Sequence, residues 1–436
     1  MTTTSTLAQR AIELLQQHIK ALGYQALVHF ELEGCCQSSS LLPAHIHRAA
    51  ATRTHTKRHQ APQKNPNKAL PATTQRKPLR SNTLSAAAPQ SEKQLCEAHF
   101  VAINSALTQA GIEGKLVSEY WHNQWEYVSL FAGQSPLKEA HNLARAIQLL
   151  PELFAQQGFE HTLIKPVVWS GDTGQLAVGS KNIFTDRQRA VHIPNAIQVN
   201  VSVLDRHGNN LVAQDNFGEI LQRCLLNTSL ANSLLYMPEP DAFERLALKD
   251  KYGLAQELCS PTDISGGHQG SVALYKERGK HNQPMGVEVL LYDQHNKALV
   301  SEQNWQKTAR VEHRLGSAST AYNPYVNVAY ALANVMDALD AYLADQGQAL
   351  LSQAFVEQAL PSQMYASQDD SQASVESEQS AYGLFAKSRW FAERINRSAR
   401  AAEHSNNEDR ELGEQLTRSI LTLYQPTNTI ALLTTG

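Results

Sequence analysis

Apolar residues recur at helical spacing in several stretches of the chain. The first stretch, residues 7–22, reads LAQRAIELLQQHIKAL and stops before Gly23, which is typical of a helix end. Asn323 and Pro324 open another stretch, because Asn caps helices well and Pro fits the first helical position. The pattern predicts further helices over about 92–110, 136–157, 217–232, 239–249 and 324–343, and in the last 55 residues. The helices in this last part either pack back on the body or form an assembly surface.

Alternation of apolar and polar residues predicts strands between these helices. YQALVHFELE follows the first helix, and AIQVNVSVL occupies residues 196–204 before a turn at Asp205–Gly208. The segment Lys115–Ser129, rich in Trp and Tyr, predicts a strand pair. Two apolar strand patterns lie in residues 269–293, and TARVEHRL predicts one more strand. Helices and strands are therefore mixed along the chain.

One long segment interrupts this pattern. From Gly34 to Ser91 there is no Asp or Glu, and basic residues run from Arg48 through Arg80. Such a segment cannot bury enough apolar surface to offset the entropy lost on ordering, which predicts a disordered insertion over residues 34–91. A solvated loop explains it better than a segment that binds an acidic partner or nucleic acid. Residues 346–380 are predicted to include an acidic linker rich in Ser and Gln.

Composition limits the class of protein. The 436 residues include 42% hydrophobic and 18% charged residues, as in ordinary globular proteins, and the net charge of -3 argues against nucleic-acid binding by the whole chain. No apolar run approaches the roughly 18 residues that span a bilayer, and the first residues do not resemble a secretory signal. Five scattered cysteines form no CxxC pair. We therefore expect a cytoplasmic protein without a membrane partner.

Glutamates occur at several places on predicted strands. Glu31 and Glu33 lie two apart in HFELEG, so both side chains point to one face of a strand. Glu119 and Glu126 flank a short turn, and Glu312 lies in RVEHR. Carboxylates on one sheet face repel one another, and Mg²⁺ or Mn²⁺, which prefer oxygen ligands, would relieve that repulsion. Taken singly, each glutamate is better explained as an exposed strand residue opposite a Lys or Arg.

Taken in order, however, four segments resemble the catalytic domain of the glutamine synthetase family. They are GYQALVHFELEG, AGIEGKLVSEYWHNQWEY, VNVSVLDRHGNNLVAQD, and RVEHR followed by NPY and an apolar helix. The family has an R-x-E-x-R strand, a short loop, NPY, and a helix rich in Ala and Leu. PDAFERL is a weaker match to a segment that contributes a substrate-binding arginine. The matches cover residues 7 to about 343.

The resemblance implies an α+β fold, a glutamine synthetase-like catalytic domain with a curved antiparallel sheet and flanking helices. Residues 1–33 would begin this domain, 92–345 would form its main body, and 381–436 would form a C-terminal helical segment. The chain starts almost at the first helix of the catalytic domain, so we expect the small N-terminal β-grasp domain of the family to be absent. The resemblance then implies a homo-oligomer or a separate chain that contains the β-grasp domain.

The resemblance also assigns roles to residues. Glu33, Glu119 and Glu126 would hold one divalent cation, Mg²⁺ or Mn²⁺. Glu31 and Glu312 would hold a second, which bridges nucleotide phosphates, and Gln198 stands where the family has a histidine ligand. Arg314 and Arg245 would be catalytic residues that face the amino-acid substrate or the transferred phosphoryl group. The residues expected near the nucleotide are Arg310, Ser202 and Asn200.

The activity implied is that of an ATP-dependent ligase of nitrogen metabolism, as in glutamine biosynthesis. ATP, a substrate, phosphorylates a side-chain carboxylate, and ammonia or an amine attacks the acyl phosphate. This sequence departs from the family at Gln198 and Asn200, which replace histidines, and at His268 and Gln269, which replace phosphate-binding arginines. Two hypotheses therefore stay open: an active carboxylate–amine ligase, favoured by the retained glutamates, and a catalytically inactive homologue with a regulatory or scaffolding role.

Overall fold

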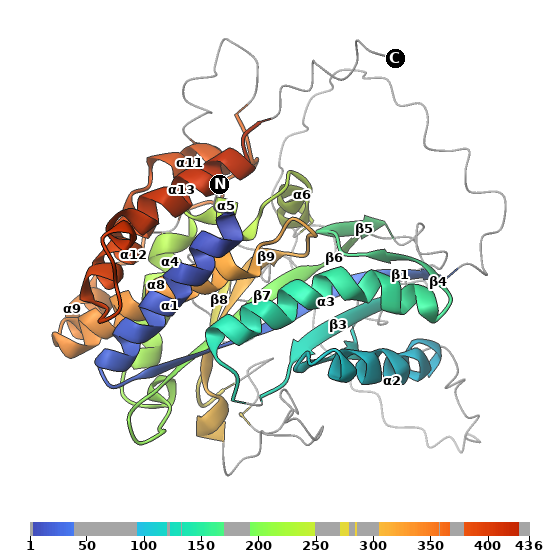
Figure 1. The fold of residues 1–436 in the computed structure, drawn as a ribbon, viewed down its shortest axis with the longest axis horizontal. Coiled ribbons are helices and arrows are strands. Elements are labelled where there is room, and N and C mark those ends of the chain that lie inside the picture. Colours follow the sequence, from blue (N-terminus) through green and yellow to red (C-terminus); the bar gives the residue numbers. More distant parts are fainter. Residues whose placement is uncertain are drawn as a thin grey trace, which may run out of the picture.

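A curved antiparallel sheet organises the protein (Figure 1). The computed structural model describes residues 3–38, 94–119, 123–131, 133–169, 192–248, 271–278, 284–285, 305–356, 358–366 and 379–426. Within these ranges, seven strands form one sheet in the order β2-β3-β1-β7-β9-β8, with β4 paired to β1, and β5 and β6 form a separate pair. The strands are β1 (Gln25–Ser38), β2 (Gly114–Ser118), β3 (Gln124–Ser129), β4 (Phe159–Leu163), β5 (Val167–Trp169), β6 (His192–Pro194), β7 (Ala196–Leu204), β8 (Val272–Tyr275) and β9 (Arg310–Ser317).

The alternating segments produce the central strands of the sheet. β1 pairs with β3 along one edge and with β7 along the other, and β7 pairs in turn with β9. β1 includes residues 34–38, which the sequence analysis assigned to the insertion, and residues 39–93 lie outside the described part. Since side chains alternate along a strand, Phe30 and Leu32 face one side of the sheet while Glu31 and Glu33 face the other.

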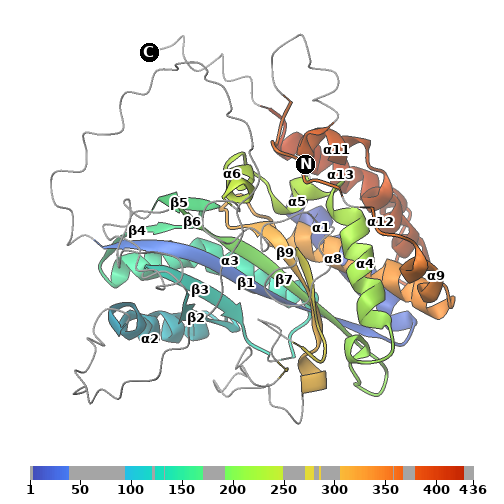
Figure 2. The same cartoon turned by 180° about the vertical axis from the view of Figure 1, so that it is seen from behind.

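Three long helices cover one face of the sheet. They are α1 (Thr4–Ala21), α3 (Pro136–Gln156) and α8 (Pro324–Leu343), each in contact with β1. They lie in front of the sheet in Figure 1, and Figure 2 shows them behind it. Asn323 caps the start of α8, as predicted from the sequence, because its side chain accepts hydrogen bonds from the N–H groups of Tyr325 and Val326.

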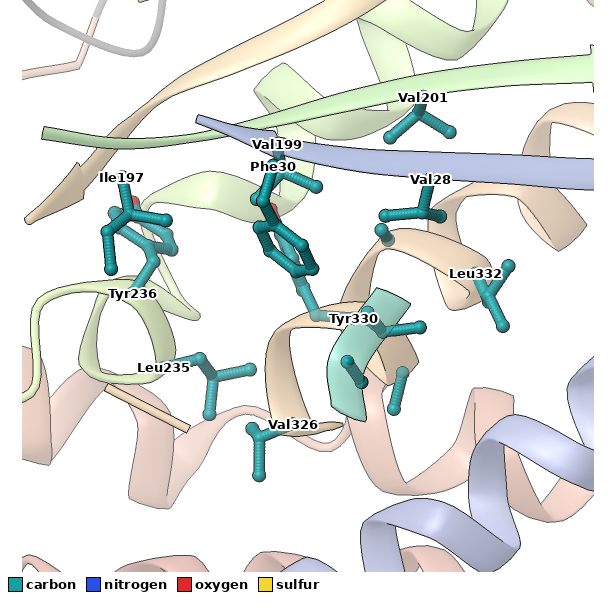
Figure 3. Packing of buried hydrophobic residues seen from close by; sticks show 14 of the residues in the cluster. Val28, Phe30, Ile197, Val199, Val201, Leu235, Tyr236, Val326, Tyr330 and Leu332 are labelled. Atoms are coloured by element: carbon teal, nitrogen blue, oxygen red, sulfur yellow. The ribbon is translucent and has the colours of Figure 1, made fainter. Parts of the chain in front are cut away.

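The hydrophobic core lies between the sheet and α8 (Figure 3). Phe30 from β1 and Val199 from β7 project toward Val326 and Tyr330 of the helix, and all four are buried. Each such side chain contributes roughly 1.5–3 kcal/mol when it leaves water. Because side chains alternate along a strand, the residues between these apolar positions on β1, β7 and β9 point to the opposite face of the sheet. Most of those residues are polar.

The C-terminal helices pack back on the body, which confirms the first of the two sequence-based alternatives. Helices α12 (Trp390–Ala401) and α13 (Leu412–Leu423) both contact α1, and Arg10 of α1 donates two hydrogen bonds to the Asp409 carboxylate, at 3.0 and 2.8 Å. Arg394 of α12 forms ion pairs with Asp337 and Asp340 of α8. The remaining helices are α2 (Gln94–Gln109), α4 (Phe217–Ser229), α5 (Ser233–Tyr236), α6 (Asp241–Ala247), α9 (Gly347–Ser352) and α11 (Ala381–Lys387), with 3₁₀ turns at Leu211–Ala213, Trp305–Thr308 and Glu408–Glu411.

Most of the predicted elements are confirmed within a few residues. The helices expected over 217–232 and 239–249 are α4 and α6, the short helix α5 lies between the two predicted ranges, and α9 lies inside the predicted linker. One of the two strand patterns in 269–293 is β8, and residues 286–293 lie outside the described part. The short strands β4, β5 and β6 were not predicted. No helix in the described ranges is long and apolar enough to cross a bilayer.

The docking of the C-terminal helices can be tested at Asp409, which is 5% exposed. We expect Asp409→Asn to lower the free energy of unfolding by about 2 kcal/mol, because hydrogen bonds to a charged partner are lost. Glu393→Gln is the control, since the Arg389–Glu393 pair on α12 is exposed and its loss should leave stability unchanged. Urea unfolding measures both. Equal midpoints for Asp409→Asn and the unmodified chain would contradict this account.

Candidate functional site

The sheet residues expected at a site all fall on the face opposite α1, α3 and α8. Glu33 of β1 lies directly opposite Glu126 of β3. Glu31 lies opposite Gln198 of β7, and Asn200 of β7 lies opposite Glu312 of β9. Partners in register project to the same face of a sheet, so strand pairing brings together residues that are far apart in the sequence.

These polar side chains are buried, except that of Glu33, which is half-buried. Glu31 is 7% exposed, Glu126 8% and Glu312 0%. Arg310 and Arg314, which flank Glu312 on β9, are also buried. A buried charge is costly unless it is paired and hydrogen-bonded, so the partners of each carboxylate decide what the face can bind.

Two arginines hold the carboxylate of Glu312. Nη1 of Arg314 donates to Oε1 at 2.5 Å, and Nη2 of Arg310 donates to Oε2 at 3.2 Å. The Tyr275 hydroxyl of β8 also donates to Oε1, at 3.4 Å, and its ring lies 4.3 Å below the Arg310 guanidinium. Both oxygens of Glu312 are therefore engaged by guanidinium groups whose own positions are fixed.

Asn200 links this ion-pair cluster to Glu31. Its Oδ1 accepts a hydrogen bond from Nε of Arg310 at 2.6 Å, and its Nδ2 donates to Oε1 of Glu31 at 3.0 Å. Within the described ranges, Oε2 of Glu31 and Nη1 of Arg310 are buried and have no hydrogen-bond partner. Oε2 of Glu31 is thus available as an acceptor and Nη1 of Arg310 as a donor, on the two residues that Asn200 joins.

Two neutral groups are among the partners of Glu33. Its Oε2 accepts from the backbone N–H of Ala196 at 2.9 Å, and its Oε1 accepts from Nε2 of Gln198 at 3.4 Å. The Oε1 atom of Gln198 is buried without a hydrogen-bond partner in the described part. Glu119 lies just past the end of β2, and its N–H donates a hydrogen bond to the Gln124 carbonyl. Val117, two residues earlier on β2, is the register partner of Glu126. The three glutamates thus occupy neighbouring positions on adjacent strands.

One end of this face offers the oxygen donors that a divalent cation prefers, although the described side chains, as arranged, do not form a metal site. Carboxylate and amide oxygens of Glu31, Glu33, Glu126 and Gln198 are the hard donors that Mg²⁺ and Mn²⁺ prefer. At the other end, both oxygens of Glu312 are ion-paired with arginines, which a cation would have to displace. Among the described residues, no three His, Cys, Asp or Glu side chains are close enough together to share an ion as arranged here.

Two of the expected site residues, Arg245 and Ser202, take part in none of the hydrogen bonds to glutamates described above. Arg245 of α6 is 2% exposed, and its guanidinium donates to the backbone carbonyls of Arg314, Leu315 and Gly316 at 3.0–3.1 Å. These carbonyls lie where the β7–β9 register shifts by a bulge. Ser202 shares the polar face, one alternation beyond Asn200 on β7.

The sequence analysis missed two polar side chains. One is Tyr275, described above. The other is His29, which precedes Glu31 by two residues and pairs in register with Asn200, but whose Nδ1 lies 3.1 Å from Oε1 of Glu139 in α3, on the helix-covered side. Its ring stacks on Phe131, and Nε2 is buried without a hydrogen-bond partner among the described residues. The alternation H-x-E-x-E was the only local signal for His29, because Glu139 is 110 residues away.

His313 belongs to the opposite face, although it lies between Glu312 and Arg314. Its Nε2 lies 3.1 Å from the Ser229 hydroxyl, and its ring packs against Tyr236 and Tyr330. Burial, aided by the charge of Arg245, lowers the pKa of His313 to about 3. This imidazole is therefore a neutral core residue.

The fold resembles solved structures of glutamine synthetase homologues. The crystal structure of a novel glutamine synthase homologue matches with a TM-score of 0.53 and 16% identity, over 96% of this chain and 72% of that chain. A complex of GmaS with ADP matches with a TM-score of 0.51 and 12% identity, over 96% of this chain and 74% of that chain. No family model and no curated protein sequence matches. The chain therefore has a glutamine synthetase-like catalytic fold, and at these identities the likeness shows the fold alone.

The contacts of Arg245 generate a test of its role. We expect Arg245→Lys to lower the free energy of unfolding by about 3 kcal/mol, because the single nitrogen of a lysine cannot reach carbonyls that the guanidinium bonds through two separate nitrogens. Arg223→Lys is the matched control, since its guanidinium donates to the Gln353 carbonyl at an exposed position and should matter little. Chemical denaturation at neutral pH measures both. A side chain used only for substrate contact would leave the stability of Arg245→Lys unchanged.

Proposed function

We propose that the polar face of the sheet is the active site of a glutamine synthetase-like ATP-dependent ligase. The enzyme would join a small-molecule carboxylate to ammonia or an amine through an acyl phosphate. The observation that carries this proposal is the convergence of Glu31, Asn200, Arg310, Glu312 and Arg314 from three strands into one buried hydrogen-bonded network. A face that only supported the fold would not need three buried charged residues on one strand.

The chemistry of phosphoryl transfer suits these groups. Negative charge spreads over the transferred phosphoryl group, and fixed guanidinium groups stabilise it. Arg310 and Arg314 are held by Glu312, so they need not reorganise during the reaction, and Nη1 of Arg310 is available as a donor. A divalent cation held by Glu33, Glu119 and Glu126 would neutralise phosphate charge when bound. The burial of the face would keep water from the acyl phosphate.

Arg245 would act as a positioning residue, since its contacts fix the backbone of β9 beside Arg314.

A catalytically inactive homologue is the alternative, and one observation favours it. Gln198 and Asn200 use their amides to bond Glu33 and Glu31, so neutral protein groups serve carboxylates that a metal would otherwise hold. In that case the face would bind a nucleotide or an ion without turnover, in a regulatory or scaffolding role.

ADP release distinguishes the two functions. We expect the purified chain, given ATP and Mg²⁺, to release ADP only when a suitable amino-acid carboxylate and an amine are both present. Arg314→Gln should lower this rate about 10²- to 10³-fold, as loss of one fixed electrostatic contact does in other enzymes. Arg418→Gln, at an exposed position on α13, should leave the rate unchanged.

Thermal unfolding should accompany this assay, because Arg314 is buried and its loss also affects stability. The rate is compared only for variants that remain folded at the assay temperature, with Arg314→Lys as the charge-conserving substitution. A folded Arg314→Gln variant as fast as the unmodified chain would place the active site elsewhere. No ADP release with any carboxylate and amine, from a chain that binds ADP, would favour the inactive homologue.

A further inference from the structure

A cavity of about 760 Å³ lies away from the polar face. It opens where α1 ends and β1 begins, on the side of the sheet that α1 and α3 cover (Figure 1). Four parts of the chain line it: the last turns of α1, the start of β1, the N-terminus of α3 and the turn after β7. Small-molecule pockets in proteins span roughly 300–1,000 Å³, so this cavity has room for a ligand of metabolite size.

The charged side chains of this cavity are mainly basic. Lys20 and Arg206 line it and are exposed, and neither forms an ion pair with a described residue. Nε of Arg206 donates only to Nε2 of His207, at 3.3 Å. Asp205 also lines the cavity, but its carboxylate accepts hydrogen bonds from the backbone of its own turn and from the Asn209 amide. Two positive charges are therefore available to a ligand, whereas the one negative charge is already hydrogen-bonded.

Helix dipoles do not decide which charge the cavity prefers. α3 begins at this wall with Ser135 and Pro136, and a helix N-terminus favours anions. α1 ends at the same wall, and a helix C-terminus favours cations. The two effects oppose each other, so the preference depends on the side chains. Three glutamines, whose amide groups can donate hydrogen bonds to an anion, add to the two cations at this wall: Gln16, Gln17 and Gln25.

Apolar side chains form much of the remaining wall. Ile19 and Ala26 are buried there, and Leu204 lies opposite Gln25 in the pairing of β7 with β1. Tyr24 lines the cavity as well. An inorganic ion gains nothing from such surface, whereas an organic ligand gains about 25 cal/mol for each Å² of apolar area that leaves water. The combination of cations and apolar wall therefore favours an organic anion.

We propose that this cavity binds a small organic anion, whose charged groups contact Lys20 and Arg206, at a site separate from the polar face. Carboxylate and phosphate groups share the required chemistry, because guanidinium and ammonium groups bind either one with charge-assisted hydrogen bonds. The site does not depend on the ligase activity or on a bound metal ion, since binding is measured without turnover.

The test is isothermal titration calorimetry of the full chain with phthalate, phenyl phosphate and inorganic phosphate at low ionic strength. We expect at least one of the two organic anions to bind, one per chain, about tenfold more tightly than inorganic phosphate. The organic anion that binds better identifies the charged group that the site prefers. Potassium chloride should weaken this binding, because the two cations are exposed and salt screens them.

A double variant locates the site. Lys20→Gln combined with Arg206→Gln should weaken binding of the organic anion about tenfold, because both charged contacts are lost. Lys165→Gln combined with Arg418→Gln, at exposed positions elsewhere, is the matched control and should leave the affinity unchanged. Thermal unfolding should give the same midpoint for both variants and the unmodified chain, since all four side chains are exposed.

Three results would overturn the proposal: binding of neither organic anion, equal affinity for inorganic phosphate, or unchanged affinity in the Lys20→Gln, Arg206→Gln variant. An affinity that falls in Arg310→Gln but not in that double variant would place the anion on the polar face and contradict the proposal. If the double variant does not fold, each single substitution provides the same comparison with a smaller loss of affinity.

Discussion

The buried carboxylate of Glu312 is the constraint on which the polar face depends. It is fully removed from solvent, and removing an isolated carboxylate from water costs several kcal/mol even after the surroundings relax. Two guanidiniums offset that cost, and they in turn need Asn200, Tyr275 and the strand order β7-β9-β8 to hold them. The pairing of three strands is therefore as necessary to the charge network as the charges themselves.

The same strand serves the core and the site. Val311 and Leu315 of β9 are fully buried in the hydrophobic core, while Glu312 and Arg314 alternate with them toward the polar face. A register shift of one residue would exchange the two sets and bury unpaired charges against α8. Arg245 bonds three successive carbonyls at the bulge in β9, so it fixes the strand at the place where such a shift would begin.

Local patterns predicted the faces of the strands but not the contacts across them. Alternation in HFELEG placed Glu31 and Glu33 on one face, and the Asn-Pro signal placed the start of α8. The pairing of Glu33 with Glu126 depends on register between strands, which no local pattern contains. Family resemblance assigned Arg245 to the substrate, whereas the side chain lies against backbone carbonyls, because its contacts are set by how α6 meets the bulge. The short strands β5 and β6 have three residues each, too few for alternation to be recognised.

A fold that is shared with glutamine synthetase homologues does not fix how the charge of the face is balanced. An ion can bind and leave after the chain has folded, so the carboxylates that hold it contribute to binding and little to folding. Guanidinium groups are part of the chain, and Arg310 and Arg314 are buried in the folded state whether or not a ligand is bound. These arginines couple the site to the fold. A change to either one alters the cost of burying the Glu312 carboxylate, and it also alters the electrostatic potential at a bound phosphate. The β9 end of the face is therefore preorganised before any ligand binds.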